Sequence, residues 1–308
     1  MNSPLHTPGL SPNPLSNPPR DYVREFLHSI AKDVANYVVA GDIPVEVINV
    51  AIQLTQKRSE IREKLCNDPS NIPVSCLART IYIAGLEYRK PWIADATLTK
   101  VIDRMFFRTA LTSTTHFVIP AKTKFCVNMS ETGSIICGKP DLLVYNLRNR
   151  TAHIVEQKTA PVFDNYSPFV GRAAIQLAMY SWLFNEYYSG GIDWLKAYIV
   201  IIRYSISKKL QAKARVIPLF IHVSNNIRDL MIDAYNALIN KEVITIDECR
   251  LAKLIYGEYA DCGDSGTVLI GAPSVVVEVN RKTNNLLFKR WRGTPNNGAT
   301  TKEGVLPQ

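Results

Sequence analysis

Hydrophobic residues recur at helical spacing through the first third of the chain. Asp21 precedes an apolar stripe that ends at Gly41, which predicts a helix with an aspartate at its N-cap. Further helices are expected from Pro44 to about Leu65 and near residues 75–90 and 95–111, because apolar residues recur there every three to four positions. The first third is therefore expected to be all-helical.

The pattern then changes to runs of β-branched and aromatic residues separated by polar turns. Such runs are typical of strands. They predict a three-stranded antiparallel meander followed by a helix, a strand, a second strand and another helix, and then a C-terminal hairpin. The expected ranges are 115–129, 134–145 and 151–159 for the meander, 171–188 for the helix, Leu195–Tyr204 and Val216–Val223 for the two strands, Asn225–Asn240 for the second helix, and Ser274–Val279 with Leu286–Trp291 for the hairpin.

This order of elements predicts an α+β fold in five segments. Six prolines in the first twenty residues predict a disordered arm. The remaining segments are a helical region that contributes to the core, a mixed core, an extension with a β-hairpin, and a flexible tail. Their expected boundaries are 1–20, 21–112, 113–242, 243–292 and 293–308.

Two short motifs on neighbouring strands carry the candidate chemistry. The first is Gly138-Lys139-Pro140-Asp141 and the second is Glu156-Gln157-Lys158-Thr159. If the turn between the strands is centred between Arg148 and Asn149, Asp141 lies opposite Glu156, with Cβ atoms about 5 Å apart. Lys158 then follows on the same face, because strand side chains alternate.

Two carboxylates this close raise one another's pKa unless a cation lies between them. A divalent cation with oxygen ligands is the simplest occupant. Such an ion polarises a phosphoryl oxygen, while a lysine beside it orients water or stabilises developing charge. Asp141 and Glu156 are thus candidate metal ligands and Lys158 a candidate catalytic lysine. The alternative is that both motifs form a solvated face of paired charges.

A third motif lies on the helix expected at 171–188. Arg172, Gln176 and Tyr180 are four residues apart, so they share one helical face. These side chains are candidates for contact with a nucleic-acid backbone. The alternative is a polar helix face with a half-buried tyrosine.

With these three motifs in this order, the chain resembles the PD-(D/E)xK nuclease superfamily, and within it the RecB-like exonuclease branch, over roughly residues 75 to 205. The resemblance implies a restriction-endonuclease-like core, in which a mixed central sheet is flanked by helices. It also implies hydrolysis of DNA with Mg²⁺ or Mn²⁺. The backbone carbonyl of Gln157 is implied as a further metal ligand, and Gln176 and Tyr180 are implied to approach the scissile region.

Family members also supply a metal ligand from an upstream helix. Glu87 is the first candidate for that position, and Asp103 and His116 are the second choices. The RecB-like branch commonly has a histidine there, and Glu87 departs from that pattern. The alternative for Glu87 is a surface carboxylate beside Arg89 and Lys90.

The chain has a formal charge of +9 and a pI of about 9.2, which favours a polyanionic partner. No acid occurs between residues 195 and 220, and Lys208 and Lys209 in this run are candidate nucleic-acid contacts. A second acid-free run covers residues 281–292. The alternative for each run is a solvated charged face.

Six cysteines occur without a CxxC pair, which argues against a zinc knuckle. They also lack the closely spaced C-terminal trio of iron–sulfur RecB-like nucleases, so no iron–sulfur cluster is expected. Free, mostly packed thiols in a reducing compartment are expected instead. We find neither a signal peptide nor a membrane span, which predicts an intracellular protein of the cytoplasm or nucleus that is not secreted.

Two other classes of function remain open at this stage. One is non-enzymatic, either a degenerate nuclease scaffold that binds nucleic acid or a protein, or an assembly protein that binds partners through its Pro-rich arm and C-terminal hairpin. The other is an RNA endonuclease of the cap-snatching type. Endonuclease or exonuclease action, polarity, strandedness and oligomeric state are not determined by the sequence.

Overall fold

The computed structural model describes residues 21–40, 46, 49–50, 53, 64–86, 93–112, 117–118, 124–146, 151–161, 167–188, 191–206, 210–262, 268–270, 275–280 and 285–290. The expected N-terminal arm, the C-terminal tail and most of the helix expected from Pro44 to Leu65 lie outside these residues.

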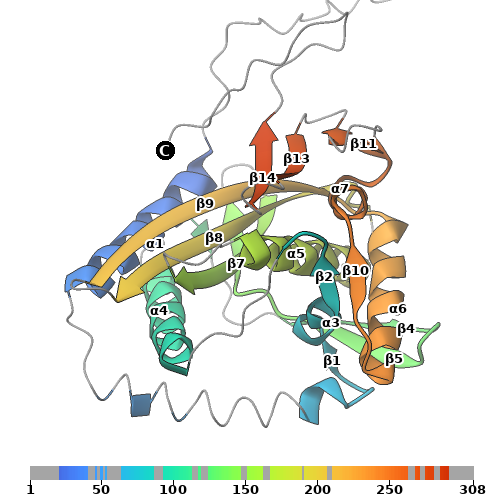
Figure 1. Ribbon diagram of the computed structural model, residues 1–308, viewed down its shortest axis with the longest axis horizontal. Coiled ribbons are helices and arrows are strands. Elements are labelled where there is room, and N and C mark those ends of the chain that lie inside the picture. The colour runs from blue at the N-terminus through green and yellow to red at the C-terminus, as the bar shows by residue number, and fades with distance from the viewer. Residues whose placement is uncertain are drawn as a thin grey trace, which may run out of the picture.

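A mixed five-stranded sheet forms the centre of the molecule (Figure 1). Its strand order is β3-β6-β7-β8-β9. β7 and β8 run parallel, and the other neighbours run antiparallel. The bounds are Phe117–Val118 for β3, Leu142–Asn146 for β6, Thr151–Pro161 for β7, Trp194–Ile206 for β8 and Leu210–His222 for β9.

Helices cover both faces of this sheet. One face carries α1 and α4, and the other carries α5 with α3, α6 and α7 around it (Figure 1). The bounds are Tyr22–Ala40 for α1, Val74–Thr80 for α3, Ile93–Thr112 for α4, Ser167–Tyr187 for α5, Asn225–Asn240 for α6 and Glu248–Tyr256 for α7. The mixed α and β composition predicted from the sequence is confirmed.

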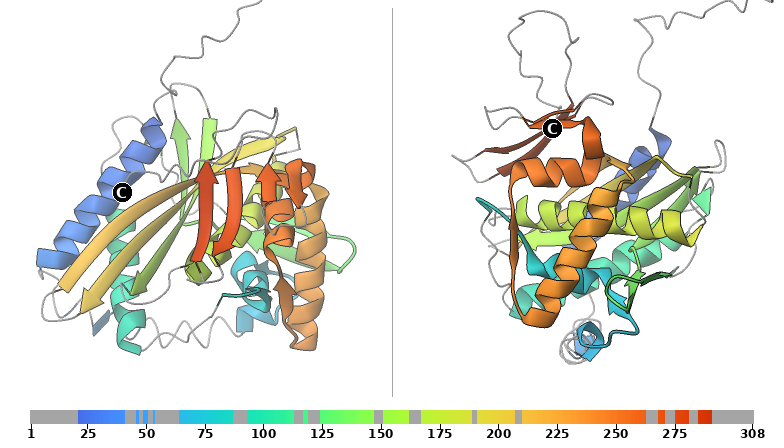
Figure 2. Two further views of the ribbon diagram at one scale, coloured as in Figure 1. Left: turned by 45° about the horizontal axis from the view of Figure 1, so that its top comes forward. Right: turned by 90° about the vertical axis from the view of Figure 1, so that its right-hand side faces the viewer.

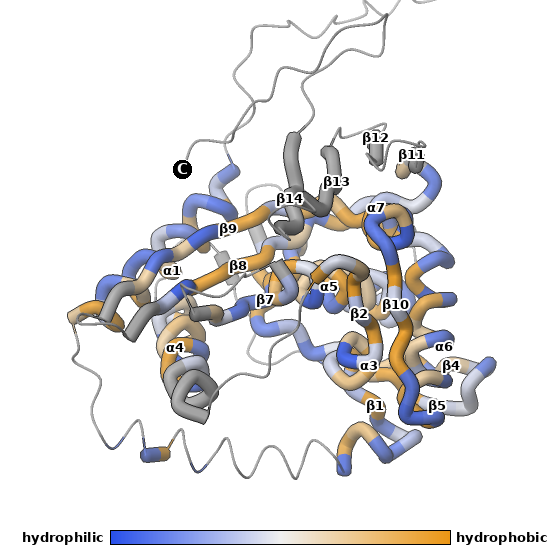
Figure 3. Tube along the Cα trace, viewed as in Figure 1, coloured by the Kyte–Doolittle hydropathy of each residue, from blue (hydrophilic) through white to orange (hydrophobic). Residues whose placement is uncertain are grey.

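Coverage of both faces explains why β8 reads as a continuous apolar run. Tyr198, Val200 and Ile202 pack against α1 and α4. The alternating residues Ile199 and Ile201 pack in the other hydrophobic cluster with α5. The middle of β8 is accordingly hydrophobic along its length (Figure 3). A strand buried on both faces has no position that favours a polar side chain.

Three smaller sheets lie around this core (Figure 2). The first joins β1, β5 and β4, the second joins β10 and β2, and the third joins β11 to β14. The C-terminal hairpin expected from the sequence is confirmed as β13 and β14. The bounds are Ile72–Pro73 for β1, Ile81–Ile83 for β2, Phe125–Met129 for β4, Ser134–Gly138 for β5, Ile244–Ile246 for β10, Ala260–Cys262 for β11, Val268–Ile270 for β12, Val275–Asn280 for β13 and Asn285–Arg290 for β14, with a 3₁₀ turn at Gly257–Tyr259.

The N-terminal third is not all-helical, and the helix expected near 75–90 ends at Thr80. Residues 81–83 form β2, which pairs in parallel with Ile244–Ile246. The β-branched Ile81 and Ile83 favour a strand, and the partner strand comes from more than 150 residues further along the chain. A local pattern contains no information about such a distant partner.

Asp21 is the N-cap of α1, as its position in the sequence predicts. Its Oδ1 accepts a hydrogen bond from the backbone N–H of Arg24 at 3.1 Å and from the Tyr198 hydroxyl at 2.8 Å. Its Oδ2 accepts from Lys196 Nζ at 2.6 Å. Because Lys196 and Tyr198 belong to β8, Asp21 also joins the start of α1 to the central sheet.

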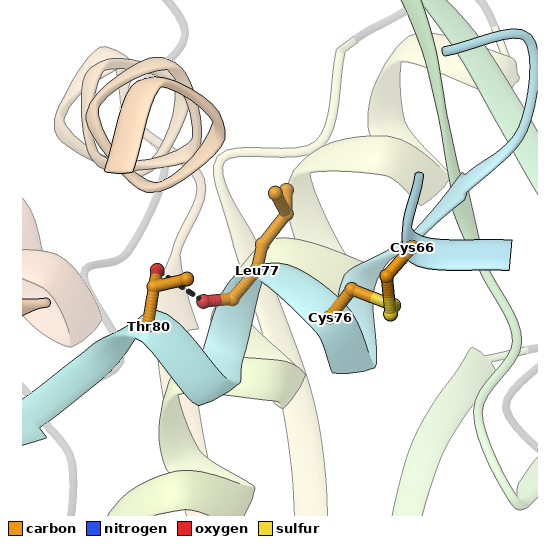
Figure 4. Close-up of a disulfide and its surroundings, with 4 residues drawn as sticks. All are labelled: Cys66, Cys76, Leu77 and Thr80. Carbon is orange, nitrogen blue, oxygen red and sulfur yellow. Dashed lines mark hydrogen bonds between the residues drawn. A yellow bond between two sulfur atoms is a disulfide. The ribbon is translucent and has the colours of Figure 1, made fainter. Parts of the chain in front are cut away.

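The expectation of free thiols is wrong for the described cysteines. Disulfides join Cys66 to Cys76 and Cys126 to Cys137, and Cys249 is also disulfide-bonded. The first joins the start of α3 to the segment before it (Figure 4). The second crosses from β4 to β5, where the two residues are register partners. Spacing alone did not reveal these pairs, because the fold brings the partners together.

Candidate metal-dependent active site

The hairpin of β6 and β7 places the carboxyl groups of Asp141 and Glu156 side by side. Leu142 pairs with Val155, and the ladder continues to Asn146 opposite Thr151. Extended by one residue, this register puts Asp141 opposite Glu156. The register predicted from the sequence is therefore confirmed.

One expected feature of this hairpin is wrong, because residues 134–145 do not form a single strand. β5 ends at Gly138 and β6 begins at Leu142. Pro140 between them has no N–H to donate to a ladder. The two strands belong to different sheets, so Asp141 lies where the chain crosses from one sheet to the other. The range expected at 115–129 is likewise divided, into β3 and β4.

A backbone hydrogen bond fixes the Asp141 carboxylate beside β7. Its Oδ2 accepts from the N–H of Gln157 at 2.7 Å. Gln157 directly follows Glu156 in the chain, so this bond holds the two carboxyl groups at the same end of the hairpin.

Glu156 is 4% exposed, and its two oxygens have different surroundings. Oε1 accepts a hydrogen bond from Lys158 Nζ, which also forms an ion pair with it. Oε2 is buried and has no hydrogen-bond partner among the described residues. Burial raises the pKa of Glu156 well above its ordinary value, and the nearby charge of Asp141 raises it further, while Lys158 acts in the opposite direction.

Asp103 on α4 is a third carboxyl group of this site. The pKa of Asp103 is raised to about 6, mainly by burial. The positive charges of Lys100 and Lys158 act to lower this pKa, whereas the negative charge of Asp141 acts to raise it. The side chain remains 35% exposed and forms an ion pair with Lys100 at 3.5 Å. Asp103 is therefore within electrostatic reach of Asp141, which is half-buried, and of the buried Glu156.

The sequence analysis ranked Asp103 behind Glu87, and one signal in the sequence could have reversed that order. Ile102 and Phe106 pack in the hydrophobic cluster beneath the sheet. Asp103 directly follows Ile102, so it lies at the edge of the buried stripe of α4 rather than on the outer face. A carboxylate there faces the rim of the sheet.

Helix α5 brings a tyrosine to the same carboxylates. Gln176 Nε2 donates a hydrogen bond to Tyr180 Oη at 3.4 Å, and both residues are buried. Burial raises the pKa of Tyr180 well above its ordinary value, and the charges of Glu156 and Asp141 raise it further. Tyr180 thus stays a neutral hydroxyl group. The sequence-based expectation that Gln176 and Tyr180 share a face is confirmed.

The remaining candidate residues are placed only in part. Arg172 lies one turn before Gln176 on α5 and is half-buried, and its role in nucleic-acid binding stays a prediction. Glu87, Lys208 and Lys209 lie outside the described residues, as does His116.

The side chains at this site have the chemistry needed to bind a divalent cation. Glu156 Oε2 is a buried carboxylate oxygen with no hydrogen-bond partner among the residues that the structure describes, and a second carboxylate lies opposite Glu156 in the strand register. Hard cations such as Mg²⁺ take oxygen ligands of this type. In the described part of the chain, no three His, Cys, Asp or Glu side chains converge as a ready-made metal site. The other oxygen of Glu156, Oε1, accepts the hydrogen bond from Lys158 Nζ.

Comparison with known proteins adds little to this geometry. No model of a known protein family matches the chain, and no curated protein matches it. Among solved structures, the crystal structure of SSO0001 is similar, with a TM-score of 0.38 and 16% sequence identity. The similarity covers 61% of this chain and 84% of that one. A TM-score this low carries no argument about function.

In the described residues, no helix is both long enough and apolar enough to cross a membrane.

Proposed function

We propose that this chain is a metal-dependent nuclease that hydrolyses phosphodiester bonds of DNA, with a restriction-endonuclease-like core of the RecB-like type. The observation that carries the proposal is the environment of Glu156. A buried carboxylate lies beside a second carboxylate, a lysine contacts one of its oxygens, and the other oxygen has no hydrogen-bond partner within the described part of the chain. Burying a carboxylate without a full set of hydrogen-bond partners costs free energy, and a site built only for stability would not include that cost.

In this proposal, Asp141, Glu156 and the backbone carbonyl of Gln157 would hold Mg²⁺ or Mn²⁺. When bound, the cation supplies Lewis acidity toward a phosphoryl oxygen and lowers the pKa of water. The two carboxylates would supply the negative charge that attracts the ion, and a bound cation would offset the charge of Asp141, which disfavours ionisation of Glu156.

Lys158 has the second role in this proposal. Its ammonium group is held at Glu156, where its three N–H donors can orient water and stabilise negative charge that develops on phosphate. Such a fixed donor contributes most where water is excluded, and Glu156 is buried beside it.

Asp103 and Tyr180 complete the reacting region. The raised pKa of Asp103, about 6, is close enough to neutral pH for its carboxylate to accept a proton from water. Tyr180 remains protonated, so its hydroxyl donates a hydrogen bond toward the carboxylates or toward phosphate. The order of elements supports the assignment, because a hairpin, helix α5 and the parallel strand β8 follow one another in the chain.

The test is hydrolysis of end-labelled DNA by purified protein with Mg²⁺, Mn²⁺ or excess chelator. Linear and circular substrates are compared, because an exonuclease requires an end and spares circles. Lys158→Ala is expected to lower the rate by about 10²–10³-fold. Lys253→Ala is the matched control, because Lys253 is exposed on α7, and it is expected to retain the wild-type rate.

Three outcomes separate the alternatives. Metal-dependent cleavage of DNA that is lost in Lys158→Ala supports the proposal. Cleavage of RNA but not DNA at the same site would change the proposed substrate from DNA to RNA. Binding without hydrolysis under every metal condition would favour a degenerate scaffold.

A further inference from the structure

Two adjacent tyrosines are exposed at the C-terminal end of α5. Tyr187 is 52% exposed and Tyr188 is 48% exposed. The preceding turns of the helix are buried, including Tyr180 and Phe184. Two neighbouring aromatic rings half in solvent present apolar faces on which another ring can stack.

These rings rest on a fixed aromatic base. Tyr187 and Tyr188 have ring centroids 5.2 Å apart, and Tyr188 lies 4.7 Å from Phe184. Phe125 contacts Tyr187 at 5.8 Å and Phe184 at 5.3 Å. Because Phe125 and Phe184 are buried, they hold the tyrosines in place, and a ligand need not order them. We call Phe125, Phe184, Tyr187 and Tyr188 the aromatic platform.

The aromatic platform lies close to the candidate active site along two elements. Tyr187 is seven residues beyond Tyr180 on α5, which corresponds to about 10 Å along the helix. Phe125 pairs with Gly138, and Gly138 is three residues before Asp141. The tyrosines therefore lie about 10 Å along the helix from Tyr180, near a nucleic acid bound at the carboxylates.

Two lysines lie at opposed positions beside the platform. The register that pairs Phe125 with Gly138, extended by one residue, puts Lys124 opposite Lys139. Both are exposed. Like charges directly opposite on neighbouring strands are destabilising. Lys124 Nζ donates a hydrogen bond to the Asn71 side-chain oxygen at 2.7 Å, which is a neutral partner. Two exposed ammonium groups at opposed positions are suited to contact phosphate.

We propose that the aromatic platform, with Lys124 and Lys139, binds single-stranded DNA next to the active site. The proposal rests on the proposed function, and it names the form of substrate that the site takes. Tyr187 and Tyr188 stack on unpaired bases, and the two lysines contact the phosphates between them. Stacking on exposed rings requires bases that are not paired, so a duplex uses the tyrosines less than a single strand does.

Binding is measured by fluorescence anisotropy in excess chelator, so that hydrolysis does not enter the result. The probes are a labelled oligo-dT, the same backbone with abasic sites, and a blunt-ended duplex. Tyr187→Ala/Tyr188→Ala is expected to weaken oligo-dT binding about tenfold or more, because each removed ring takes away the stacking of one base. Abasic and duplex binding are expected to change less than about twofold.

Two variants control for other effects. Tyr187→Phe/Tyr188→Phe keeps both rings and is expected to bind oligo-dT nearly as well as wild type. Tyr37→Ala removes a tyrosine that is 42% exposed on α1, and it is expected to have no effect. Photocrosslinking of wild-type protein to iodouracil-substituted DNA gives a readout that needs no variant, with adducts expected on Tyr187 or Tyr188.

Equal binding of oligo-dT by the alanine pair, equal losses on single strands and duplex, or crosslinks that exclude both tyrosines would each overturn the proposal. Failure of wild type to bind oligo-dT would overturn it as well. If wild type binds through the tyrosines but never hydrolyses DNA with metal, the single-strand site stands and the proposed nuclease activity fails. If DNA is hydrolysed with metal but its binding does not depend on the tyrosines, the proposed nuclease activity stands and the single-strand site fails.

Discussion

Gly138 lies so close to Tyr180 that a Cβ atom at residue 138 would be 2.8 Å from Tyr180 Cδ1. The same atom would lie 2.9 Å from Leu183 Cδ1. Real Cβ atoms almost never come this close to another heavy atom. The glycine of the first motif therefore permits β5 to pack directly against α5, which keeps Tyr180 beside the Asp141 and Glu156 carboxyl groups.

Gly138→Ala is expected to lower the free energy of unfolding by about 1–3 kcal/mol, because both neighbours are buried and must shift. Urea denaturation measures this change. Ser130→Ala, at an exposed turn position, is the control and is expected to change stability by less than about 0.5 kcal/mol. Unchanged stability in Gly138→Ala would contradict the close packing of β5 on α5.

Asp103→Asn is expected to slow metal-dependent hydrolysis by about a hundredfold, because the amide cannot accept a proton from water. The rate is measured against pH as well as metal concentration. In wild type the rate is expected to rise as pH increases through about 6, where Asp103 ionises, and the variant is expected to lose that step. Asp229→Asn, at an exposed position of α6, is the matched control. An unchanged pH profile in Asp103→Asn would exclude a role in proton transfer.

Mg²⁺ or Mn²⁺ is expected to raise the thermal unfolding midpoint of wild-type protein, because an ion that binds the folded state stabilises it. At about one hundred times its dissociation constant, the ion would contribute about 2.7 kcal/mol. Glu156→Gln removes one ligand charge and is expected to show a smaller rise at every metal concentration. Equal rises in both proteins would place the bound ion elsewhere. The measurement is differential scanning fluorimetry with a chelator baseline.

Asp21 is expected to make stability depend on acid pH. Its burial acts to raise its pKa, but hydrogen bonds from Lys196, Arg24 and Tyr198 leave the pKa below the ordinary value of 3.8. A lowered folded-state pKa gives stability that is present above 3.8 and is lost as pH falls through the folded pKa.

Asp21→Asn keeps a side chain that can cap α1 but removes the charge. It is expected to be less stable than wild type at neutral pH, and the difference should shrink as pH falls below 3.8. Asp33→Asn, an exposed residue of the same helix, should show no such trend. A difference that is independent of pH would attribute the effect to packing and not to charge.

The disulfides predict resistance of the cysteines to alkylation. Cys66, Cys76, Cys126 and Cys137 are expected to remain unlabelled in the native protein and to react after reduction, as mass spectrometry of peptides would show. Cys126→Ser/Cys137→Ser is expected to lower stability by about 2–4 kcal/mol, because the cross-link restricts the unfolded chain. Labelling of these residues without reductant would show that they are free thiols and would contradict the disulfides.

The sequence predicted those features of the site that depend on local repetition. Strand alternation and the turn position placed Asp141 opposite Glu156, and the observed pairing of Leu142 with Val155 agrees. Spacing of four residues placed Gln176 and Tyr180 on one face of α5. Helix α6 has the predicted bounds, Asn225–Asn240. Each of these follows from backbone geometry that repeats within a few residues.

The tertiary structure decided what comes from distant parts of the chain. Asp103 comes within electrostatic reach of Asp141 because α4 packs against the sheet; the spacing of α4 places Asp103 at the edge of its buried stripe but does not say which residue of the sheet lies near it. The division of residues 134–145 between two sheets and the pairing of β2 with β10 depend on partners supplied by the fold. Local propensity determines an element, whereas long-range packing selects its neighbours, and the neighbours set the burial and charge of Glu156.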